Sequence, residues 1–397
     1  MSSKKIQLRG RKVEAGGRDL ITTRKVNALV TALLGWFAES ARDLPWRRTR
    51  DPYAIWVSEI MLQQTQVKTV IPYWERWMGA LPAIKDLAEA KAETIHKLWE
   101  GLGYYTRVRN MQKGAKEIVA KHGGTFPREY EAILELPGIG RYTAGAISSI
   151  AFNEAKAILD GNVVRVLTRV FGIAENPREK LTNAKLWRLA EELVVAAQQV
   201  DQNIHERSCS HLNQALMELG ALVCTPRQPK CLLCPVRGHC VAYETGRVEE
   251  LPNLGVRATA TARRFVAFVV ELRGRYLVRQ RAAGVVNGHL WEFPNVEMVA
   301  GVVDLKAIAK AELGMVATGV EELCAIKHTI TRYRITLEVY RVTAKAGGGK
   351  NAAGLCWLRL EELEALAFAS AHRAVLKRLG SAISAKQIKT FTKFGKA

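Results

Sequence analysis

Two acidic side chains stand in apolar surroundings, where an acid is disfavoured unless it is paired or functional. Glu59 lies in the segment 55–62, which carries no other charge, and Asp160 is bounded by apolar residues and Gly161. Partial burial would raise the pKa of Glu59, so that it could hold a proton near neutrality. With an ionised Asp160 it would form the pair of carboxylates that breaks a glycosidic bond, one as the acid and one beside the oxocarbenium ion. A structural role stays open for Asp160, which is to cap the helix that begins at Gly161 or Asn162.

Four cysteines follow the spacing C-x6-C-x2-C-x5-C. Four thiolates within seventeen residues can hold one compact soft-metal centre. Zinc is the alternative, but its usual spacing has two CxxC pairs, or one CxxC and a distant pair of histidines. Disulfides are not expected in a chain with no export signal. The spacing therefore favours a [4Fe–4S] cluster with these ligands: Cys224, Cys231, Cys234 and Cys240.

A proline and two glycines predict a tight turn between two helices. The turn would direct backbone N–H groups outward at the start of the second helix, where the helix dipole also favours an anion. Many helix pairs use such a turn, so the signal alone is weak. We expect it to bind a phosphate oxygen, through Pro137, Gly138, Ile139 and Gly140.

Charge is concentrated at the ends of the 397-residue chain, whose 59 Lys and Arg against 38 Asp and Glu give a net charge of +21. Residues 1–25 hold eight basic and two acidic residues, and residues 373–397 hold seven basic and no acidic ones. Such a balance points to nucleic acid, an anionic membrane face or an acidic protein as partner. No apolar run approaches the roughly 18 residues that span a bilayer, and the amino terminus lacks a signal-peptide core. The ends are either solvated tails or non-specific contacts for DNA phosphates.

Hydrophobic spacing predicts two domains of different class. Apolar residues recur every three or four positions from about Val26 to Cys240, which is typical of helices. From Arg264 the alternation is typical of strands, with short helical patterns after them. We predict a multidomain chain in which an all-α domain precedes a smaller α/β or α+β domain. The predicted segments are a basic tail (1–27), a helical catalytic domain (28–240) with its cysteine loop (224–240), a linker (241–261), the second domain (262–376) and another basic tail (377–397).

Taken together, these segments resemble the helix-hairpin-helix DNA glycosylases that carry an iron–sulfur cluster, and specifically the MutY-type adenine DNA glycosylases. The resemblance implies removal of adenine mispaired with 8-oxoguanine or guanine, with double-stranded DNA as the partner. It also implies a monomer that is cytoplasmic, associated with the nucleoid and not bound to a membrane. The motifs that carry it span nearly all of residues 28–240 and include Leu44-Pro45-Trp46, 58–67, 101–105 and 159–163.

The resemblance assigns a role to each matching residue. Glu59 matches the general acid that protonates adenine at N7, and Asp160 matches the carboxylate that stabilises the sugar cation. Tyr142 and Asn162 match positions that orient these two groups. Extrusion of a base needs wedges and a pocket. The matching residues are Gln64 and Tyr104 for the wedges, and Arg42, Leu44, Trp46, Arg47 and Gln214 for the wall of the adenine pocket.

Position 142 separates two kinds of enzyme within this superfamily. Endonuclease III-like members have a lysine there, which attacks C1′ and allows strand cleavage through a Schiff base. Tyr142 cannot form one, and Val164 stands where the MutY pattern often has another lysine. The resemblance therefore implies a monofunctional enzyme that uses water and leaves an abasic site.

The second domain resembles the Nudix fold through residues 288–294. Its helical segment 308–314 has one glutamate where Nudix hydrolases cluster several to bind magnesium, so the fold is expected without the hydrolase. In MutY-type enzymes this domain recognises 8-oxoguanine through a loop reading F-S-H, which here reads Ile330-Thr331-Arg332. Thr331 can replace the serine hydroxyl, whereas Arg332 would trade base reading for phosphate contact. Lesion recognition is expected, and the degree of 8-oxoguanine preference stays open.

Two other functions are compatible with parts of the pattern. A thymine mismatch glycosylase could share the fold, but thymine has no ring nitrogen that matches the purine N7 for Glu59 to protonate. A non-catalytic DNA-binding scaffold could use the turn and the cluster for docking, but it would not need both Glu59 and Asp160.

Overall fold

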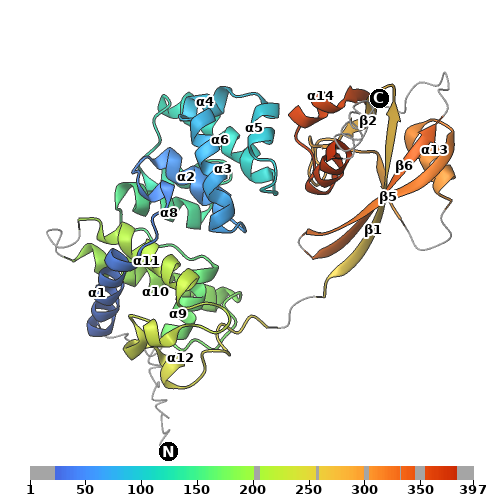
Figure 1. Cartoon of the computed structure of the whole chain (residues 1–397). Coiled ribbons are helices and arrows are strands. Elements are labelled where there is room, and N and C mark those ends of the chain that lie inside the picture. The colour runs from blue at the N-terminus through green and yellow to red at the C-terminus, as the bar shows by residue number, and fades with distance from the viewer. Residues whose placement is uncertain are drawn as a thin grey trace, which may run out of the picture. The chain divides into compact units, whose positions relative to one another are not determined.

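The computed structural model of the chain (Figure 1) describes residues 23–200, 206–255, 259–298, 304–330, 332–344 and 354–381. Thr331 and most of both predicted basic tails lie outside the described residues. Contacts divide the chain into a first unit, residues 1–41 and 153–253, and a second unit, residues 42–152 and 254–397. The predicted helical domain therefore contributes to both units.

The helical part of the second unit is formed by one continuous stretch of chain. Its elements are η1 (Pro45–Arg47), α2 (Pro52–Leu62), α3 (Val67–Ala80), α4 (Ile84–Glu89), α5 (Ala92–Leu98), α6 (Thr106–His122), α7 (Tyr130–Glu135) and α8 (Arg141–Phe152). Helix α2 begins sharply because the Asp51 side chain accepts the N–H of Tyr53 and Pro52 fits the first helical position. Residues 53–61 of α2 are all buried, so this helix lies at the centre of the fold.

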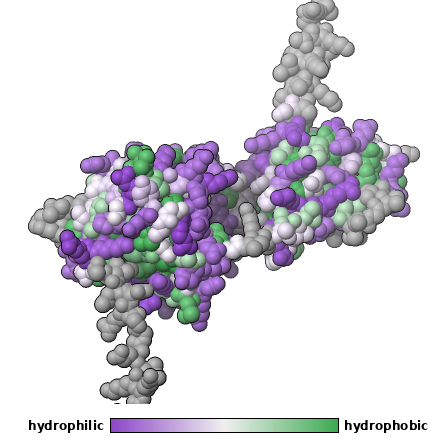
Figure 2. All heavy atoms as spheres, turned by 90° about the horizontal axis from the view of Figure 1, so that it is seen from below, coloured by the Kyte–Doolittle hydropathy of each residue, from purple (hydrophilic) through white to green (hydrophobic). Residues whose placement is uncertain are grey.

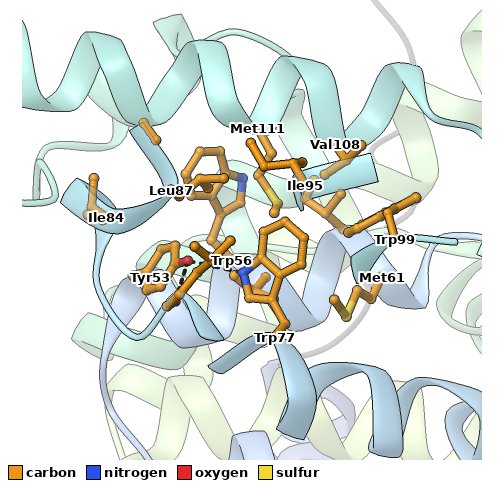
Figure 3. Packing of buried hydrophobic residues seen from close by; sticks show 14 of the residues in the cluster. Tyr53, Trp56, Met61, Trp77, Ile84, Leu87, Ile95, Trp99, Val108 and Met111 are labelled. Carbon is orange, nitrogen blue, oxygen red and sulfur yellow. Dashed lines mark hydrogen bonds between the residues drawn. The ribbon is translucent and has the colours of Figure 1, made fainter. Parts of the chain in front are cut away.

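Aromatic side chains pack around α2 (Figure 3). The indole of Trp77 donates to the Tyr53 hydroxyl at 3.0 Å, and that hydroxyl donates to the carbonyl of Leu81 at 2.9 Å. The rings of Trp77 and Trp99 meet edge to face, with centroids 5.7 Å apart. These hydrogen bonds and ring contacts connect Tyr53 of α2 to its neighbours, and they hold the helix in one position in the core.

The first unit consists of helices and the cysteine loop. Its elements are α1 (Thr23–Ser40), α9 (Gly161–Val170), α10 (Lys180–Gln198), α11 (Ser208–Leu222), η2 (Cys231–Leu233), η3 (Arg237–His239) and α12 (Val241–Glu244). Helix α1 packs on α10 and α11 through buried Leu29, Leu33 and Phe37. Helix α11 approaches α9 so closely that a Cβ at Gly220 would lie 2.6 Å from the Cβ of Asn162. Only glycine fits this crossing without a shift of one helix.

The second unit also contains a mixed seven-stranded sheet. Its elements are β1 (Thr261–Leu272), β2 (Arg275–Gln280), β3 (Trp291–Glu292), β4 (Asn295–Glu297), α13 (Leu305–Leu313), β5 (Ala317–Ile330), β6 (Tyr333–Ala344), β7 (Leu355–Arg359) and α14 (Leu360–Ala365). A last described helix covers residues 370–381. The main strand order is β3-β2-β1-β6-β5, β4 pairs with β1 and β7 with β2, and only the β1–β6 pair is parallel among the described strands.

Side chains of β1 alternate between two hydrophobic cores, one on each face of the sheet. Ala267 and Val269 enter the core that contains Leu363 of α14, whereas Val266 and Phe268 enter the core on the side of α13. Figure 1 shows α13 and α14 on opposite sides of the strands. The fold class predicted from the sequence, a helical domain followed by an α/β or α+β domain, is confirmed.

The surface agrees with a folded chain that buries its apolar residues. Figure 2 shows one face, on which hydrophilic side chains predominate and hydrophobic ones form small groups. Over the described ranges, no helix combines the length and the apolar character that crossing a membrane requires.

Several predicted boundaries differ from the elements observed. Helix α1 starts at Thr23, inside the predicted tail. Its first buried residue is Val26, so its apolar face begins before the predicted domain boundary at residue 28. The predicted linker 241–261 opens with α12. The last helix continues past residue 376, and Val375, Leu376 and Leu379 are buried. The basic residues from 373 to 381 are therefore attached to a core helix and do not form a tail.

Candidate active site

Glu59 is a buried acid whose carboxylate is held by a tyrosine. It lies in the apolar centre of α2 and is 4% exposed. The Tyr142 hydroxyl, from the first turn of α8, donates to Oε2 of Glu59 at 2.6 Å. The structure thus brings together two residues that lie 83 positions apart in the sequence.

Asp160 caps helix α9, which confirms the structural role left open by the sequence. Its Oδ1 accepts the backbone N–H of Val163 at 2.7 Å, and its Oδ2 accepts Nδ2 of Asn162 at 2.9 Å. Burial raises the pKa of the Asp160 carboxyl, and these hydrogen bonds and the charge of Arg165 partly offset that rise. A carboxylate can accept more than two hydrogen bonds, so the cap is compatible with a chemical role for Asp160.

Asn162 is fixed from both sides. Its Oδ1 accepts Nη2 of Arg165 at 2.8 Å, while its amide nitrogen donates to Asp160. Arg165 also donates to the carbonyl of Gly220 at 2.7 Å and, through Nε, to the carbonyl of Cys224 at 2.7 Å. A continuous hydrogen-bonded path therefore joins Asp160 to the first cysteine of the cysteine loop, and all its members belong to the first unit.

The four predicted metal ligands line one cavity of the first unit. All four are free of disulfides. Among the described residues, no three His, Cys, Asp or Glu side chains lie close enough to hold a single metal ion. Four cysteines around one cavity can supply one thiolate to each iron of a [4Fe–4S] cluster.

A buried arginine lies beside the cysteine loop. Burial raises the pKa of the Cys234 thiol to about 11, and a bound metal would lower that pKa by stabilising the thiolate. Arg169, which is 2% exposed, donates to Sγ of Cys224 at 3.4 Å and to the carbonyls of Thr225 and Leu251 at 2.8 Å each. Its charge lies where thiolate charge would gather.

Sequence reasoning did not single out Arg165 and Arg169. They lie four residues apart on α9, one turn of helix, among valines and leucines. In a chain of net charge +21 such residues resemble surface contacts for an anion. The sequence signal for a structural role is that both arginines lie among apolar residues in the helix that follows Asp160.

The predicted phosphate turn lies between α7 and α8 as a tight hairpin. The N–H of Ile139 donates to the carbonyl of Leu136 at 3.0 Å, and the Ile139 side chain is buried. Gly138 has a φ of +81°, and a Cβ there would lie 2.6 Å from the Cβ of Asn110. Gly140 is exposed, and a Cβ there would meet no atom within 4 Å. The turn thus presents exposed backbone at the start of a twelve-residue helix.

The residues predicted to form the adenine pocket belong to both units. Leu44 and Trp46 are 5% and 6% exposed in the helical core, where the rings of Trp46 and Trp74 lie 6.1 Å apart. Arg47 donates to the carbonyl of Arg42 at 2.9 Å. In the first unit, Gln214 is 8% exposed and donates to Oγ of Ser210 at 3.1 Å.

The two predicted wedge residues share an unusual backbone. Gln64 has a φ of +58° and Tyr104 a φ of +47°, a region that residues other than glycine seldom adopt. The Tyr104 side chain is 43% exposed. Strained backbone of this kind concentrates at functional sites.

Arg332 directly precedes Tyr333, which pairs with Ile330 at the end of the β5–β6 hairpin. Arg332 donates to the Tyr333 hydroxyl at 3.1 Å and lies over its ring, as Arg263 does from β1. Arg332 carries a positive charge at this end, whereas Arg263 is paired with Glu297. Thr331, the other residue of this segment that we predict to contact the substrate, lies outside the described residues.

The single glutamate of α13 is paired with an arginine. Oε2 of Glu312 accepts Nη1 of Arg279 at 3.0 Å, and Arg279 also binds buried Glu292 at 2.8 Å. A guanidinium thus neutralises the carboxylate that a hydrolase would use for magnesium, which favours the prediction of a Nudix fold without the hydrolase.

Protein-family models match three segments of the chain. A model of the HhH-GPD superfamily of base excision DNA repair proteins matches residues 57–192. The iron–sulfur binding domain of endonuclease III matches residues 224–240, and a NUDIX domain matches residues 265–378.

Named relatives match most of the chain. The adenine DNA glycosylases of Rattus norvegicus and Homo sapiens are each 36% identical to it, over 412 and 415 residues. Both alignments cover 89% of this chain, and they cover 78% and 74% of those proteins. A solved structure of a thermostable thymine-DNA glycosylase is 32% identical with a TM-score of 0.50, and the match covers 56% of this chain and 98% of that one.

Proposed function

Because this chain belongs to the adenine DNA glycosylase family, we propose that it removes adenine mispaired with 8-oxoguanine or guanine from double-stranded DNA. The chain is a base excision repair enzyme that hydrolyses N-glycosidic bonds, and it has the iron–sulfur domain of its superfamily. The observation that carries the proposal is Glu59, an acid buried in an apolar helix with its carboxylate oriented by Tyr142. The enzyme would act as a monomer on chromosomal DNA.

Glu59 is the general acid of the proposed reaction. A proton transferred from Glu59 to N7 makes adenine a neutral leaving group, which lowers the barrier to breaking the bond at C1′. The hydrogen bond from Tyr142 holds one oxygen of the Glu59 carboxyl group and thereby orients the acid. Thymine offers no equivalent nitrogen, so this arrangement favours a purine substrate.

Asp160 stabilises the sugar cation that forms as adenine leaves. Its position at the N-terminus of α9 favours the ionised form through the helix dipole, and Asn162 fixes its orientation. Stabilisation by a preorganised charge is worth most in a site from which water has been excluded.

The final nucleophile is water, and the product is an abasic site. The position at which related lyases carry an attacking amine holds Tyr142, whose hydroxyl is already bound to Glu59. We propose a monofunctional glycosylase on this ground.

We propose Cys224, Cys231, Cys234 and Cys240 as the ligands of the [4Fe–4S] cluster. When bound, the cluster would order the cysteine loop. Arg227, Lys230 and Arg237 lie on that loop and suit contacts with DNA phosphates.

A thymine-directed glycosylase is the second candidate, because the helical part of the chain matches one of known structure. The two candidates differ in the base released. Single-turnover assays with A opposite 8-oxoguanine, A opposite guanine and T opposite guanine test them together. We expect release of adenine from the first two duplexes, whereas release of thymine would support the alternative.

The same assay measures the lesion preference that the sequence left open. Arg332 at the hairpin turn suits a phosphate contact better than a base contact. We propose that the preference for 8-oxoguanine over guanine is smaller than in relatives with a neutral residue at this position. Arg332→His should increase the ratio of the two rates, and an unchanged ratio would reject this part of the proposal.

A further inference from the structure

Arg107 is a half-buried cation that joins two loops of the second unit. It lies in the first turn of α6. Its Nη1 donates to the carbonyls of Ile60 and Gln63 at 2.7 and 2.5 Å, at the end of α2. Its Nη2 donates to the carbonyls of Leu102 and Gly103 at 3.0 and 3.2 Å, in the loop before α6.

The residues that follow these carbonyls are the two proposed wedges. Gln64 comes directly after Gln63, and Tyr104 directly after Gly103. Both wedges have a left-handed backbone, which is unfavourable for a side chain larger than hydrogen and persists only where surrounding contacts impose it. Arg107 supplies such contacts to both loops at once.

The guanidinium also supports the Tyr104 ring from one side. Its central carbon lies 5.5 Å from the centre of the Tyr104 ring and 5.4 Å from that of the Trp99 ring. The Trp99 indole in turn donates to the carbonyl of Gly103 at 3.0 Å. The loop before α6 is therefore held at its carbonyls and at its aromatic side chain by the same pair of residues.

Charge pairing does not explain why an arginine is present here. Among the described residues, Arg107 has no hydrogen bond or ion pair to a carboxylate, and its Nε–H has no acceptor. Burial lowers the pKa of Arg107 to about 10, which still leaves it protonated at neutral pH. A buried cation without a counter-ion is costly, so its planar fork of donors is the feature that the site uses.

We propose that Arg107 is a positioning residue that holds Gln64 and Tyr104 in the conformation that wedges into duplex DNA. This inference rests on the proposed function, because it assumes that the two residues enter the duplex. It assigns to Arg107 the control of base extrusion and not of the chemical step.

The test compares Arg107→Met, which removes every donor, with Arg107→Lys, which keeps the charge but loses the fork. Lys113→Met is the control, because it removes a positive charge from the exposed side of the same helix. The probe is a duplex with 2-aminopurine next to a non-cleavable 2′-fluoro-adenosine opposite 8-oxoguanine. Its fluorescence rises when a wedge unstacks the neighbouring base, and no reaction is needed.

With saturating wild-type protein or Lys113→Met, we expect the fluorescence to rise. With either Arg107 variant, the rise should fall by more than half. Single-turnover adenine release should fall roughly tenfold or more in both, because a lysine cannot span two loops. If Arg107 acts through the wedge, Arg107→Met combined with Tyr104→Ala should be less than about threefold slower than the slower single variant.

A full fluorescence rise in Arg107→Met, or losses that multiply in the double variant, would overturn the proposal. Should Arg107→Met fail to bind its cluster, the same two measurements on Arg107→Lys decide between the same outcomes. Absence of adenine release by wild-type protein on every duplex would instead reject the proposed function. The two failures are therefore distinguishable.

Discussion

The hydroxyl of Tyr142 and Oε2 of Glu59 are 2.6 Å apart, and the tyrosine is the donor. One residue thereby does two things at the candidate active site. It orients the proposed acid, and in the proposed monofunctional mechanism it takes the place of an amine that would attack the sugar. The identity of residue 142 thus links the geometry of the acid to the type of product.

Tyr142→Phe should slow single-turnover adenine release about tenfold or more, because its hydrogen bond stabilises the negative charge that Glu59 gains as it gives up its proton. A hydrogen bond to a charged group contributes about 1.5–3 kcal/mol. The product should remain an abasic site. Tyr340→Phe is the matched control, since it removes another tyrosine–glutamate hydrogen bond, to Glu338 in the sheet. A rate in Tyr142→Phe equal to that of the control would show that the bond does not serve catalysis.

Wild-type protein should give no sizeable covalent complex with DNA in the presence of borohydride, because Tyr142 cannot form a Schiff base. Tyr142→Lys restores an amine at this position and should yield a trapped complex on a gel. Abundant trapping by the wild-type protein would contradict the monofunctional assignment.

Asp160 should give the reaction an acid limb above the ordinary aspartate range, which is centred at about 3.9. Burial raises the pKa of this carboxyl, so the ionised form, and with it the rate, is lost as the pH falls through that raised value. The raised pKa also means that ionisation costs stability: the stabilising effect of the protonated form is lost as the pH rises through the folded-state pKa. Asp160→Asn should lose activity about 100-fold or more. Its amide oxygen can still accept the N–H of Val163, but its amide nitrogen cannot accept the hydrogen bond of Asn162.

Asp304→Asn is the control for this prediction. Asp304 caps α13 with an exposed side chain that accepts the N–H groups of Lys306 and Ala307. Its substitution should leave both the pH–rate profile and the rate unchanged. An Asp160→Asn protein that retains activity would contradict the account.

Arg169→Met should reduce the amount of cluster bound. It removes the donor to Sγ of Cys224 and leaves the buried carbonyls of Thr225 and Leu251 without this donor. Iron content and the absorbance at about 400 nm measure the loss. Arg237→Met changes an exposed arginine of the same loop and should retain the cluster, so equal iron in both variants would reject the role of Arg169.

Removal of residues 1–22 and 382–397 should reduce the dependence of DNA binding on salt, because it removes basic residues while leaving every described helix intact. Single-turnover release should stay close to the wild-type rate. A truncation from residue 373 is a poor test, since it deletes buried Val375 and Leu379 and the ion pair of Arg373 with Glu100, at 2.6 Å. A large loss of rate in the shorter deletion would show that these ends contribute to the chemical step.

The sequence could predict the features that depend on short spacing. The cysteine pattern, the turn before α8 and the acids Glu59 and Asp160 each lie within a few residues of the signal that reveals them. The fold class followed in the same way, from the change of hydrophobic period near Arg264.

The features that arise from tertiary packing were not predictable. Arg107, Arg165 and Arg169 look like phosphate contacts in a basic chain, yet each binds carbonyls that lie 44 or more positions away. Gly220 is ordinary in sequence, and only the crossing of α11 over α9 shows why a side chain is excluded there. The segment after residue 373 resembles a tail in sequence because it has many basic residues and few apolar ones. Its apolar residues Val375, Leu376 and Leu379 are nevertheless buried.

The central claim is that Glu59 protonates adenine, and Glu59→Gln tests it most directly. The amide keeps the shape of the side chain and can still accept the hydrogen bond of Tyr142, but it has no proton to transfer in this way. Exposed Glu93→Gln is the matched control. Single-turnover release from a duplex with A opposite 8-oxoguanine should fall about 100-fold or more in Glu59→Gln and stay at the wild-type rate in the control. Adenine release by Glu59→Gln at the wild-type rate would contradict the claim.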